Sequence, residues 1–295
     1  MKRSLTQPLK RSWLALPLLT LTLNLGLLSP SLMAQPLNLP EHSSVPGGVA
    51  LIPLTIDSNT PPEARYGKNR VLVVPSTNTD YADQAPWVAL IGIPLSAKPG
   101  TQQLNVGNEV ISFEVVDKHY REQRLVIKNK RKVNPNKLDL DRIGKEKRKM
   151  LAALGNWGDS NLNVIRFARP AKGPFSSPFG LKRFFNDQPR KPHSGLDIAA
   201  PKGTPIVAPA PGIVTDTGDY FFNGRNLILD HGQGLITMYS HMNRIDVEVG
   251  QRVELGQQLG TVGSSGRVTG PHLHWSVSLN NVRVDPILFL YPDQR

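Results

Sequence analysis

The stretch from residue 271 to residue 279 constrains the fold more than any other part of the sequence. It reads Pro-His-Leu-His-Trp-Ser-Val-Ser-Leu, in which polar and apolar residues alternate strictly. On a β-strand, successive side chains point to opposite faces, so this pattern predicts a strand with one polar face and one face packed on a core. The polar face carries His272, His274, Ser276 and Ser278, and the core face carries Leu273, Trp275, Val277 and Leu279.

The two histidines of this strand are suited to shared chemistry. Residues at i and i+2 of a strand have α-carbons about 7 Å apart. That spacing lets His274 or His272 bind a metal while the other reaches a water at the metal. A His-x-His pair alone is a weak signal, because it is more often an exposed polar face.

A second candidate pair lies earlier, in His193-Ser194-Gly195-Leu196-Asp197. On a straight strand, residues at i and i+4 are about 13 Å apart, too far to share one ion. Gly195 permits a bend that brings the imidazole and the carboxylate together. In isolation this segment reads as an unrelated surface turn. Together with the later His-x-His strand it supplies a His, an Asp and a His, a ligand set that zinc accepts with one position left open.

Histidine and aspartate must carry any metal chemistry in this part of the chain. The sequence has no cysteine, which excludes disulfides, a thiol nucleophile and cysteine-type zinc sites. It also has no His-Glu-x-x-His helix, the source of the glutamate base in many zinc proteases. His241 is a third candidate, at the end of a strand predicted to pair with residues 226–230 through the turn at 231–234. His231 lies in that turn and is interpreted as a structural, hydrogen-bonding residue.

The fold class predicted for the whole chain is mainly β, with two domains. Residues 35–133 are predicted to form a small all-β domain, because short β-type runs alternate with turn-formers there. Residues 134–160 are predicted to be a linker with a helix over 138–154, in which acids come early, cations come late, and Gly155 ends the helix. Residues 161–295 are again β-rich and form the second domain. The runs in the first domain are 49–55, 70–74, 87–93, 109–116 and 124–127.

Residues 1–34 have the layout of a secretory signal peptide. Four cations and no acid precede an apolar run, and a small residue, Ala34, ends the segment. We expect cleavage after Ala34 and an exported protein, periplasmic or associated with the cell envelope. The apolar run is short of the roughly 20 residues that span a bilayer, and an uncleaved membrane anchor is the alternative.

The positive charge of the chain is concentrated in one segment. The formal net charge is +12, and residues 118–149 hold thirteen Lys or Arg against four acids, a surplus of nine. A solvated basic face on a connecting segment is one interpretation. The other is weak attachment to an anionic wall or membrane surface. Nucleic acid is not expected as a partner, because the chain carries an export signal.

Several ordered motifs between residues 170 and 288 resemble the lysostaphin-type (LytM-like) zinc metallopeptidases of bacterial cell walls. They include His193-x-x-x-Asp197, Tyr-Ser-His-Met around His241, and Gly-Pro-His-Leu-His-Trp at 270–275. The resemblance implies a compact antiparallel β catalytic domain of the duplicated hybrid motif type. It also implies one zinc ion per chain on His193, Asp197 and His274, with His241 and His272 as catalytic residues.

The function implied by this resemblance is that of an exported zinc metallo-endopeptidase of peptidoglycan. It cuts peptide cross-links or stem peptides, with D,D-endopeptidase action as the expected type, in cell wall remodelling. His272 is the candidate base and His241 the candidate donor to the oxyanion, and these two roles can be exchanged. The alternative is a non-catalytic, wall-binding activator of another peptidoglycan hydrolase. The first β domain resembles the accessory domain of exported members, and the sequence leaves open whether it inhibits or positions the catalytic domain.

Overall fold

The computed structural model describes residues 38–77, 79–158 and 165–295. These residues belong to one compact unit of the chain, residues 35–295. The predicted signal peptide, residues 1–34, and its cleavage point lie outside the described residues. None of the helices in the described part of the chain combines the length and the apolar character that crossing a membrane requires.

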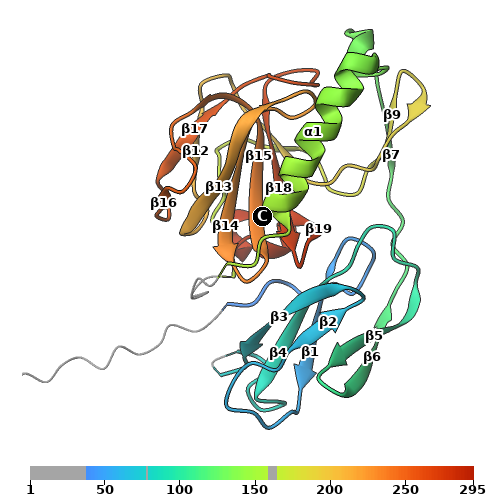
Figure 1. Ribbon diagram of the computed structural model, residues 1–295, viewed down its shortest axis with the longest axis vertical. Coiled ribbons are helices and arrows are strands. Elements are labelled where there is room, and N and C mark those ends of the chain that lie inside the picture. Colours follow the sequence, from blue (N-terminus) through green and yellow to red (C-terminus); the bar gives the residue numbers. More distant parts are fainter. Residues whose placement is uncertain (1–37, 78, 159–164) are drawn as a thin grey trace, which may run out of the picture. The chain divides into compact units, whose positions relative to one another are not determined.

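A six-stranded antiparallel sheet is built from the first part of the described chain (Figure 1). Its strand order is β1-β4-β3-β2-β5-β6. Strand β4, which lies between β1 and β3, is buried along its whole length, because alternate residues contribute to two different cores. The strands are β1 (Val49–Leu54), β2 (Ala64–Tyr66), β3 (Asn69–Pro75), β4 (Trp87–Gly92), β5 (Gly100–Val106) and β6 (Glu109–Val115).

The next segment contains a short strand and a helix. Strand β7 (Glu122–Leu125) pairs in parallel with β9 (Lys182–Phe185), and β10 (Gln188–Pro189) completes this three-stranded sheet. After a 3-10 turn, η1 (Lys130–Lys132), the helix α1 (Lys137–Leu154) matches the predicted helix. Asn136 caps its start in a capping box with Asp139, which satisfies backbone N–H groups that the first turn leaves unpaired.

Helix α1 is packed on the C-terminal part of the molecule and does not stand free. Leu154, at its end, lies in a small apolar cluster with Ile228, Ile236 and Met238. Polar contacts fix its solvent side: Lys149 forms an ion pair with Asp216 at 2.6 Å. The predicted linker helix is therefore attached to the surface of strands β13 (Gly212–Tyr220), β14 (Gly224–Gly232) and β15 (Leu235–Ile245).

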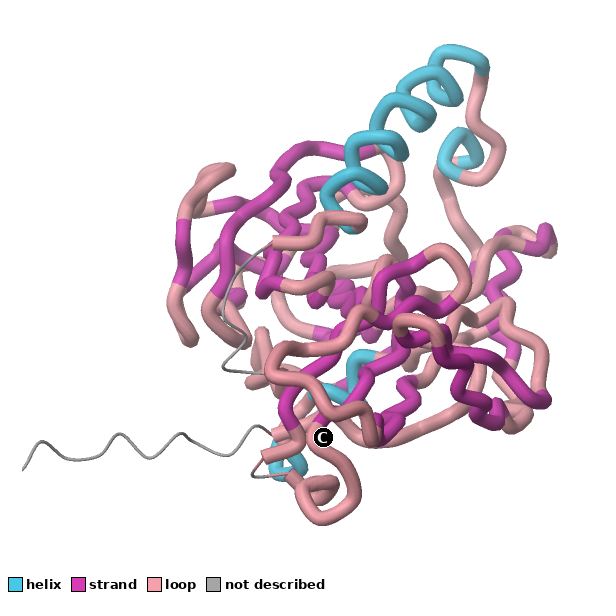
Figure 2. Tube along the Cα trace, turned by 60° about the horizontal axis from the view of Figure 1, so that its bottom comes forward, coloured by secondary structure: helices cyan, strands magenta, loops and turns pink. Residues whose placement is uncertain are grey.

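The C-terminal part is a ten-stranded sheet with the order β16-β13-β14-β15-β18-β11-β8, and β12, β17 and β19 attached to it. Strand β18 is the predicted His-x-His strand, and its four apolar residues lie in the main core as expected. Strands make up most of the regular structure, so the predicted fold class is confirmed (Figure 2). The strands are β8 (Phe175–Ser177), β11 (Leu196–Ala199), β12 (Pro205–Val207), β13 (Gly212–Tyr220), β14 (Gly224–Gly232), β15 (Leu235–Ile245), β16 (Arg252–Val253), β17 (Gln258–Val262), β18 (His272–Leu279) and β19 (Val282–Val284), followed by η2 (Pro286–Phe289) and η3 (Pro292–Gln294).

Candidate metal and catalytic site

His193, Asp197 and His274 converge on one point. Nε2 of His193 lies 3.0 Å from Oδ1 of Asp197 and 2.9 Å from Nδ1 of His274. The third side of this triangle, from His274 Nδ1 to Asp197 Oδ1, is 2.8 Å. All three side chains are buried. Two imidazole nitrogens and one carboxylate oxygen in this arrangement fit a zinc ion, which binds such atoms at about 2.0–2.2 Å.

The strand register explains why these residues meet. Strand β18 lies between β11 and β15, and His274 is directly opposite Asp197 on β11. His193 comes from the loop before β11, where its backbone N–H donates to Leu181 O and its carbonyl accepts from Gly180. These two bonds hold the loop so that the ring of His193 faces the Asp197–His274 pair.

Gly195 allows this approach for a reason that differs from the predicted bend. A Cβ at this position would lie 2.5 Å from the backbone oxygen of Trp275 and 2.7 Å from the His274 ring. Contacts that short do not occur between real Cβ atoms and backbone. The glycine is therefore needed because the loop passes directly against β18.

Hydrogen bonds orient His193 and His274, the two candidate ligand histidines. Nδ1 of His193 lies 2.7 Å from the carbonyl oxygen of Pro178, which only accepts, so Nδ1 carries the proton and Nε2 keeps its lone pair. Nε2 of His274 lies 3.1 Å from Oγ of Ser276, which leaves Nδ1 toward the triangle. Such contacts to the second ring nitrogen are typical of metal-binding histidines.

The charge states of the triangle favour a cation. Burial acts to raise the pKa of Asp197, but the hydrogen bonds and charges of His193 and His274 outweigh it and hold that pKa well below its usual value. Burial lowers the pKa of His274 to about 4, against the attraction of Asp197. At neutral pH the site thus offers an ionised carboxylate and unprotonated imidazole, the forms that bind metal.

His272 and His241 flank the triangle, and each is tied to a backbone carbonyl. Nδ1 of His272 lies 2.9 Å from Gly270 O, and Nδ1 of His241 lies 2.8 Å from Ser265 O. Both rings therefore carry a proton at Nδ1, and Nε2 is the ring nitrogen that remains to exchange a proton with a ligand. Nε2 of His272 is 3.9 Å from Asp197 Oδ1, and the centroids of the two rings are 4.9 Å apart. Burial, then repulsion by His272 and His274, places the pKa of His241 well below its usual value.

His241 reaches this face through an irregularity in β15. Tyr239 and Met242 both lie in the core, whereas regular alternation would give them opposite faces. Residues 240 and 241 together oppose the single residue 226 of β14, which is a β-bulge. His241 has φ 65°, a left-handed conformation that costs roughly 1–3 kcal/mol in a residue other than glycine. The bulge turns its ring away from the core and toward His272.

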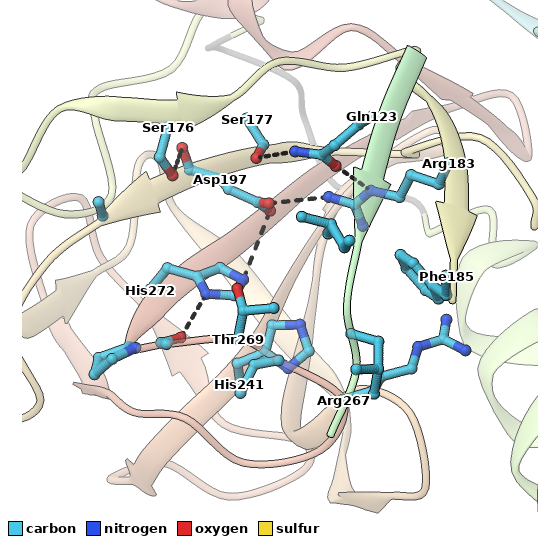
Figure 3. A pocket seen from close by; sticks show the side chains of 16 residues that line it. Gln123, Ser176, Ser177, Arg183, Phe185, Asp197, His241, Arg267, Thr269 and His272 are labelled. Atoms are coloured by element: carbon cyan, nitrogen blue, oxygen red, sulfur yellow. Dashed lines mark hydrogen bonds and ion pairs between the residues drawn. The ribbon is translucent and has the colours of Figure 1, made fainter. Parts of the chain in front are cut away.

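A chain of hydrogen bonds supports the candidate metal ligand Asp197 from the side (Figure 3). Nη2 of Arg183 donates to Asp197 Oδ2 at 3.1 Å, and its Nε donates to Gln123 Oε1 at 3.0 Å. Gln123 in turn donates to Ser177 Oγ at 3.0 Å. Gln123 is on β7 and Arg183 on β9, so the parallel pairing of these strands brings a residue from the linker segment to the site.

The structure brings together all five predicted site residues, and their individual roles stay predictions. Sequence reasoning missed Arg183 and Gln123, because their contact depends on strand pairing between distant segments, which no local pattern indicates. Ser276 could have been found, since it shares the polar face of the alternating strand with His274. His231, interpreted as structural, is buried, with Nδ1 2.7 Å from Pro211 O and Nε2 2.8 Å from Thr237 Oγ1.

Two segments of the chain match known families. Residues 191–286 match Peptidase family M23, and residues 42–118 match the Peptidase family M23 N-terminal domain. A crystal structure assigned to peptidase M23 from Pseudomonas aeruginosa is 43% identical, with a TM-score of 0.70, and the alignment covers 84% of this chain and 95% of that one. The chain belongs to peptidase family M23. Its predicted likeness to LytM-like peptidases with a preceding accessory domain is thereby confirmed.

The curated relatives of this family M23 chain are longer proteins than the chain itself. Peptidoglycan DD-endopeptidase ShyC of Vibrio cholerae is 37% identical over 142 residues, which is 45% of this chain and 32% of that protein. DD-carboxypeptidase/endopeptidase Mpg of Neisseria gonorrhoeae is 38% identical over 135 residues, 46% of this chain and 30% of that protein. The chain thus matches about a third of the length of these relatives.

Proposed function

We propose that this chain is a zinc metallo-endopeptidase that hydrolyses peptide bonds of peptidoglycan, in cross-links or stem peptides, with D,D-endopeptidase action. The observation that carries the proposal is the triangle of His193 Nε2, Asp197 Oδ1 and His274 Nδ1, with sides of 2.8 to 3.0 Å. Two histidines with free Nε2 atoms flank it. The names of the Vibrio and Neisseria relatives support the substrate class.

The metal ion and the two flanking histidines have different roles in the proposed peptide hydrolysis. A zinc ion held there supplies Lewis acidity, which polarises a peptide carbonyl and lowers the pKa of a bound water. His272 offers Nε2 to take a proton from the attacking water. His241 also offers an unprotonated Nε2, so it must gain a proton before it can donate to the oxyanion or to the leaving amine. Both rings present the same nitrogen, and the two roles can therefore be exchanged.

The alternative function is a wall-binding protein that activates another hydrolase without catalysis. That function needs neither a complete ligand set nor free histidine nitrogens beside it. This chain has all three ligand residues and both flanking histidines in contact geometry. The catalytic function accounts for this arrangement, and the alternative leaves it without a purpose.

Metal analysis and product analysis test the proposal together. We expect purified protein to hold about one zinc per chain and to cleave defined cross-linked muropeptides at the cross-link, as seen by mass spectrometry of the products. The variant Asp197→Asn, which removes the ligand charge, serves as the control and should hold little zinc and release no product. Protein that holds one zinc and leaves every muropeptide intact would contradict the proposal and favour the activator.

We also propose that the protein is exported to the periplasm or cell envelope. Support comes from the basic and then apolar composition of residues 1–34. Cell fractionation and N-terminal sequencing test it, with Gln35 expected as the first residue of the mature protein. An intact N-terminus in the membrane fraction would indicate an anchor, and a cytoplasmic location would contradict export.

A further inference from the structure

Two hollows meet at the metal triangle. The first holds Asp197 and His272 and is bordered by Gln123 on β7 (Figure 3). The second, which we call the helix-side groove, holds His193 and His274 and is bordered by α1. Four residues line both: Arg183, Phe185, His241 and Arg267. A peptide cut at the triangle has one part on each side of the broken bond, so the two hollows are the places available for those parts.

The helix-side groove is strongly cationic. Its walls carry six Lys or Arg residues and one acid, Glu146. The carboxylate of Glu146 is already engaged, because it pairs with Arg142 at 2.5 Å and accepts from the backbone N–H of Phe221 at 2.8 Å. The six cations are Lys147, Arg183, Arg190, Lys191, Arg267 and Arg283.

Three of these guanidinium groups, on Arg190, Arg267 and Arg283, form no ion pair with a carboxylate within the described ranges 38–77, 79–158 and 165–295. Arg190 donates to neutral acceptors, among them Val133 O at 2.9 Å and Gln188 Oε1 at 2.6 Å. Removing a cation from water without an anionic partner is unfavourable. An anion supplied by a ligand would provide the missing partner.

Arg267 is held in a fixed position for such a ligand. Its guanidinium carbon lies 4.6 Å from the ring centroid of Phe185 and 4.2 Å from that of Phe222, so two aromatic rings contact the guanidinium group. Burial, together with the neighbouring charges of Arg183 and Arg190, lowers the pKa of Arg267 to about 10. It therefore stays charged at neutral pH.

Arg283 lies further along the same groove. It is on β19, directly opposite Ser278 of β18, in line with the polar face that carries His274. Burial lowers its pKa to about 10, so it too stays charged at neutral pH. Helix α1 contributes four apolar residues to the groove, Ile143, Met150, Leu151 and Leu154, beside the charged Glu146 and Lys147.

We propose that the helix-side groove binds the part of the substrate that carries free carboxylates, with Arg267 and Arg283 as the carboxylate-binding residues. The guanidinium fork matches a carboxylate with two parallel hydrogen bonds, and it has no such match with a carboxamide. The apolar residues that α1 contributes suit short aliphatic side chains beside those carboxylates. The protein should therefore distinguish an acidic stem peptide from the same peptide with amidated carboxylates. This inference rests on the proposed function for the identity of the substrate as a peptidoglycan peptide.

A binding experiment tests this inference independently of catalysis. The ligands are two cross-linked muropeptides that differ only in having free or amidated side-chain carboxylates. Binding is measured by calorimetry on the full chain carrying His272→Ala, loaded with zinc. We expect the free acid to bind roughly 10- to 100-fold more tightly, the range of a charged hydrogen bond. Arg267→Gln and Arg283→Gln should each reduce that ratio, and the double variant should bring it close to one.

Controls separate this result from general electrostatics and from failure of the proposed function. Arg252→Gln removes an exposed cation on β16, outside the groove, and should leave the ratio unchanged. Equal binding of the two peptides, or a ratio that survives in the double variant, overturns the inference. Carboxylate-dependent binding by a wild-type protein that cleaves neither peptide upholds the inference and contradicts the proposed enzyme.

Discussion

The six-stranded sheet and the ten-stranded sheet bury different kinds of side chain. Within the described residues, strands β1 to β6 bury only apolar side chains. The ten-stranded sheet buries many polar ones, and burying these is unfavourable unless each finds a partner. The difference teaches that the first sheet is organised around apolar packing, whereas the second also accommodates buried polar groups, among them those of the candidate site. The buried polar residues of the second are Asp197, Asp216, Asn226, Asp230, His231, Thr237, Ser240, His241, Thr261, His274, Ser276 and Ser278.

Loss of a proposed metal ligand in the ten-stranded sheet should have the largest effect, on both zinc content and activity. His274→Ala removes one corner of the triangle, so we expect most of the bound zinc and all measurable activity to disappear. The protein should remain folded, because the apolar side chains of β18 are unchanged. Metal analysis and circular dichroism check the two statements. Retention of one zinc per chain would mean that the ligand assignment is wrong.

Loss of a flanking histidine should leave the metal in place and slow the reaction. In His272→Ala and in His241→Ala the three ligands remain, so zinc should stay near one per chain. Turnover should fall by about 10²- to 10⁴-fold, the usual effect of removing a general acid or base. Steady-state cleavage of a muropeptide and zinc analysis on the same sample measure both quantities. If His272→Ala loses zinc, this histidine belongs among the ligands.

A buried structural histidine should make stability depend on pH. Burial lowers the pKa of His231 to about 4 in the folded protein, against about 6.5 when unfolded. Below pH 6.5 the imidazole of His231 becomes protonated in the unfolded chain, whereas in the folded chain it stays neutral down to about pH 4. The free energy of unfolding therefore falls as the pH drops from about 6.5 to about 4. At pH 5 the loss is about 2 kcal/mol. The free energy of unfolding is measured with denaturant at pH 7 and at pH 5, with chelator present. Its difference between the two pH values should be smaller for His231→Gln than for the wild-type protein. Equal differences in the two proteins would contradict this assignment.

A smaller effect, on zinc affinity, should follow when Gln123 is replaced, because Gln123 holds the Arg183 that donates a hydrogen bond to Asp197. Gln123→Ala frees Nε of Arg183, so the ligand carboxylate is held less firmly, and zinc affinity should fall by about 10-fold. Competition with a chelator measures this affinity. Gln103→Ala is the matched control, because Gln103 is exposed on β5 of the first sheet. Equal affinities for the two variants would show that β7 contributes nothing to the metal site.

The smallest expected effect concerns the basic segment 118–149. Several of its cations are already paired within the protein, such as Arg131 with Asp139 and Arg142 with Glu146. The remaining exposed ones should add weak retention on sacculi that declines with salt, because exposed charges are screened over about 8 Å at physiological ionic strength. Co-sedimentation at low and high salt measures this retention. Replacement of Lys128 and Lys145 by Gln should weaken retention on sacculi more than Lys68→Gln does. Retention that does not change with salt would contradict a role of the basic segment.

Much of the site could be predicted from the sequence, because its elements have short-range patterns. Alternation identified β18 and its two faces, and the motif around His193 and Asp197 supplied the two residues that the structure brings to His274. The position of His241 beside His272 could not be derived from alternation, because a bulge reverses the faces of β15 at that point. The hydrogen bonds by which Gln123 and Arg183 support Asp197 could not be predicted from the sequence, because they require the parallel pairing of β7 and β9.

The central place of β18 has a consequence for the order of events during folding. It joins β11 to β15, and the contact between Asp197 and His274 closes a loop of 77 residues. Contacts between such distant segments form slowly, because chain entropy must be lost before they contribute. A high-affinity metal site therefore exists only once β18 has been inserted between its neighbours. Zinc uptake should be a late kinetic phase, and it should report the fraction of molecules in which the sheet is complete.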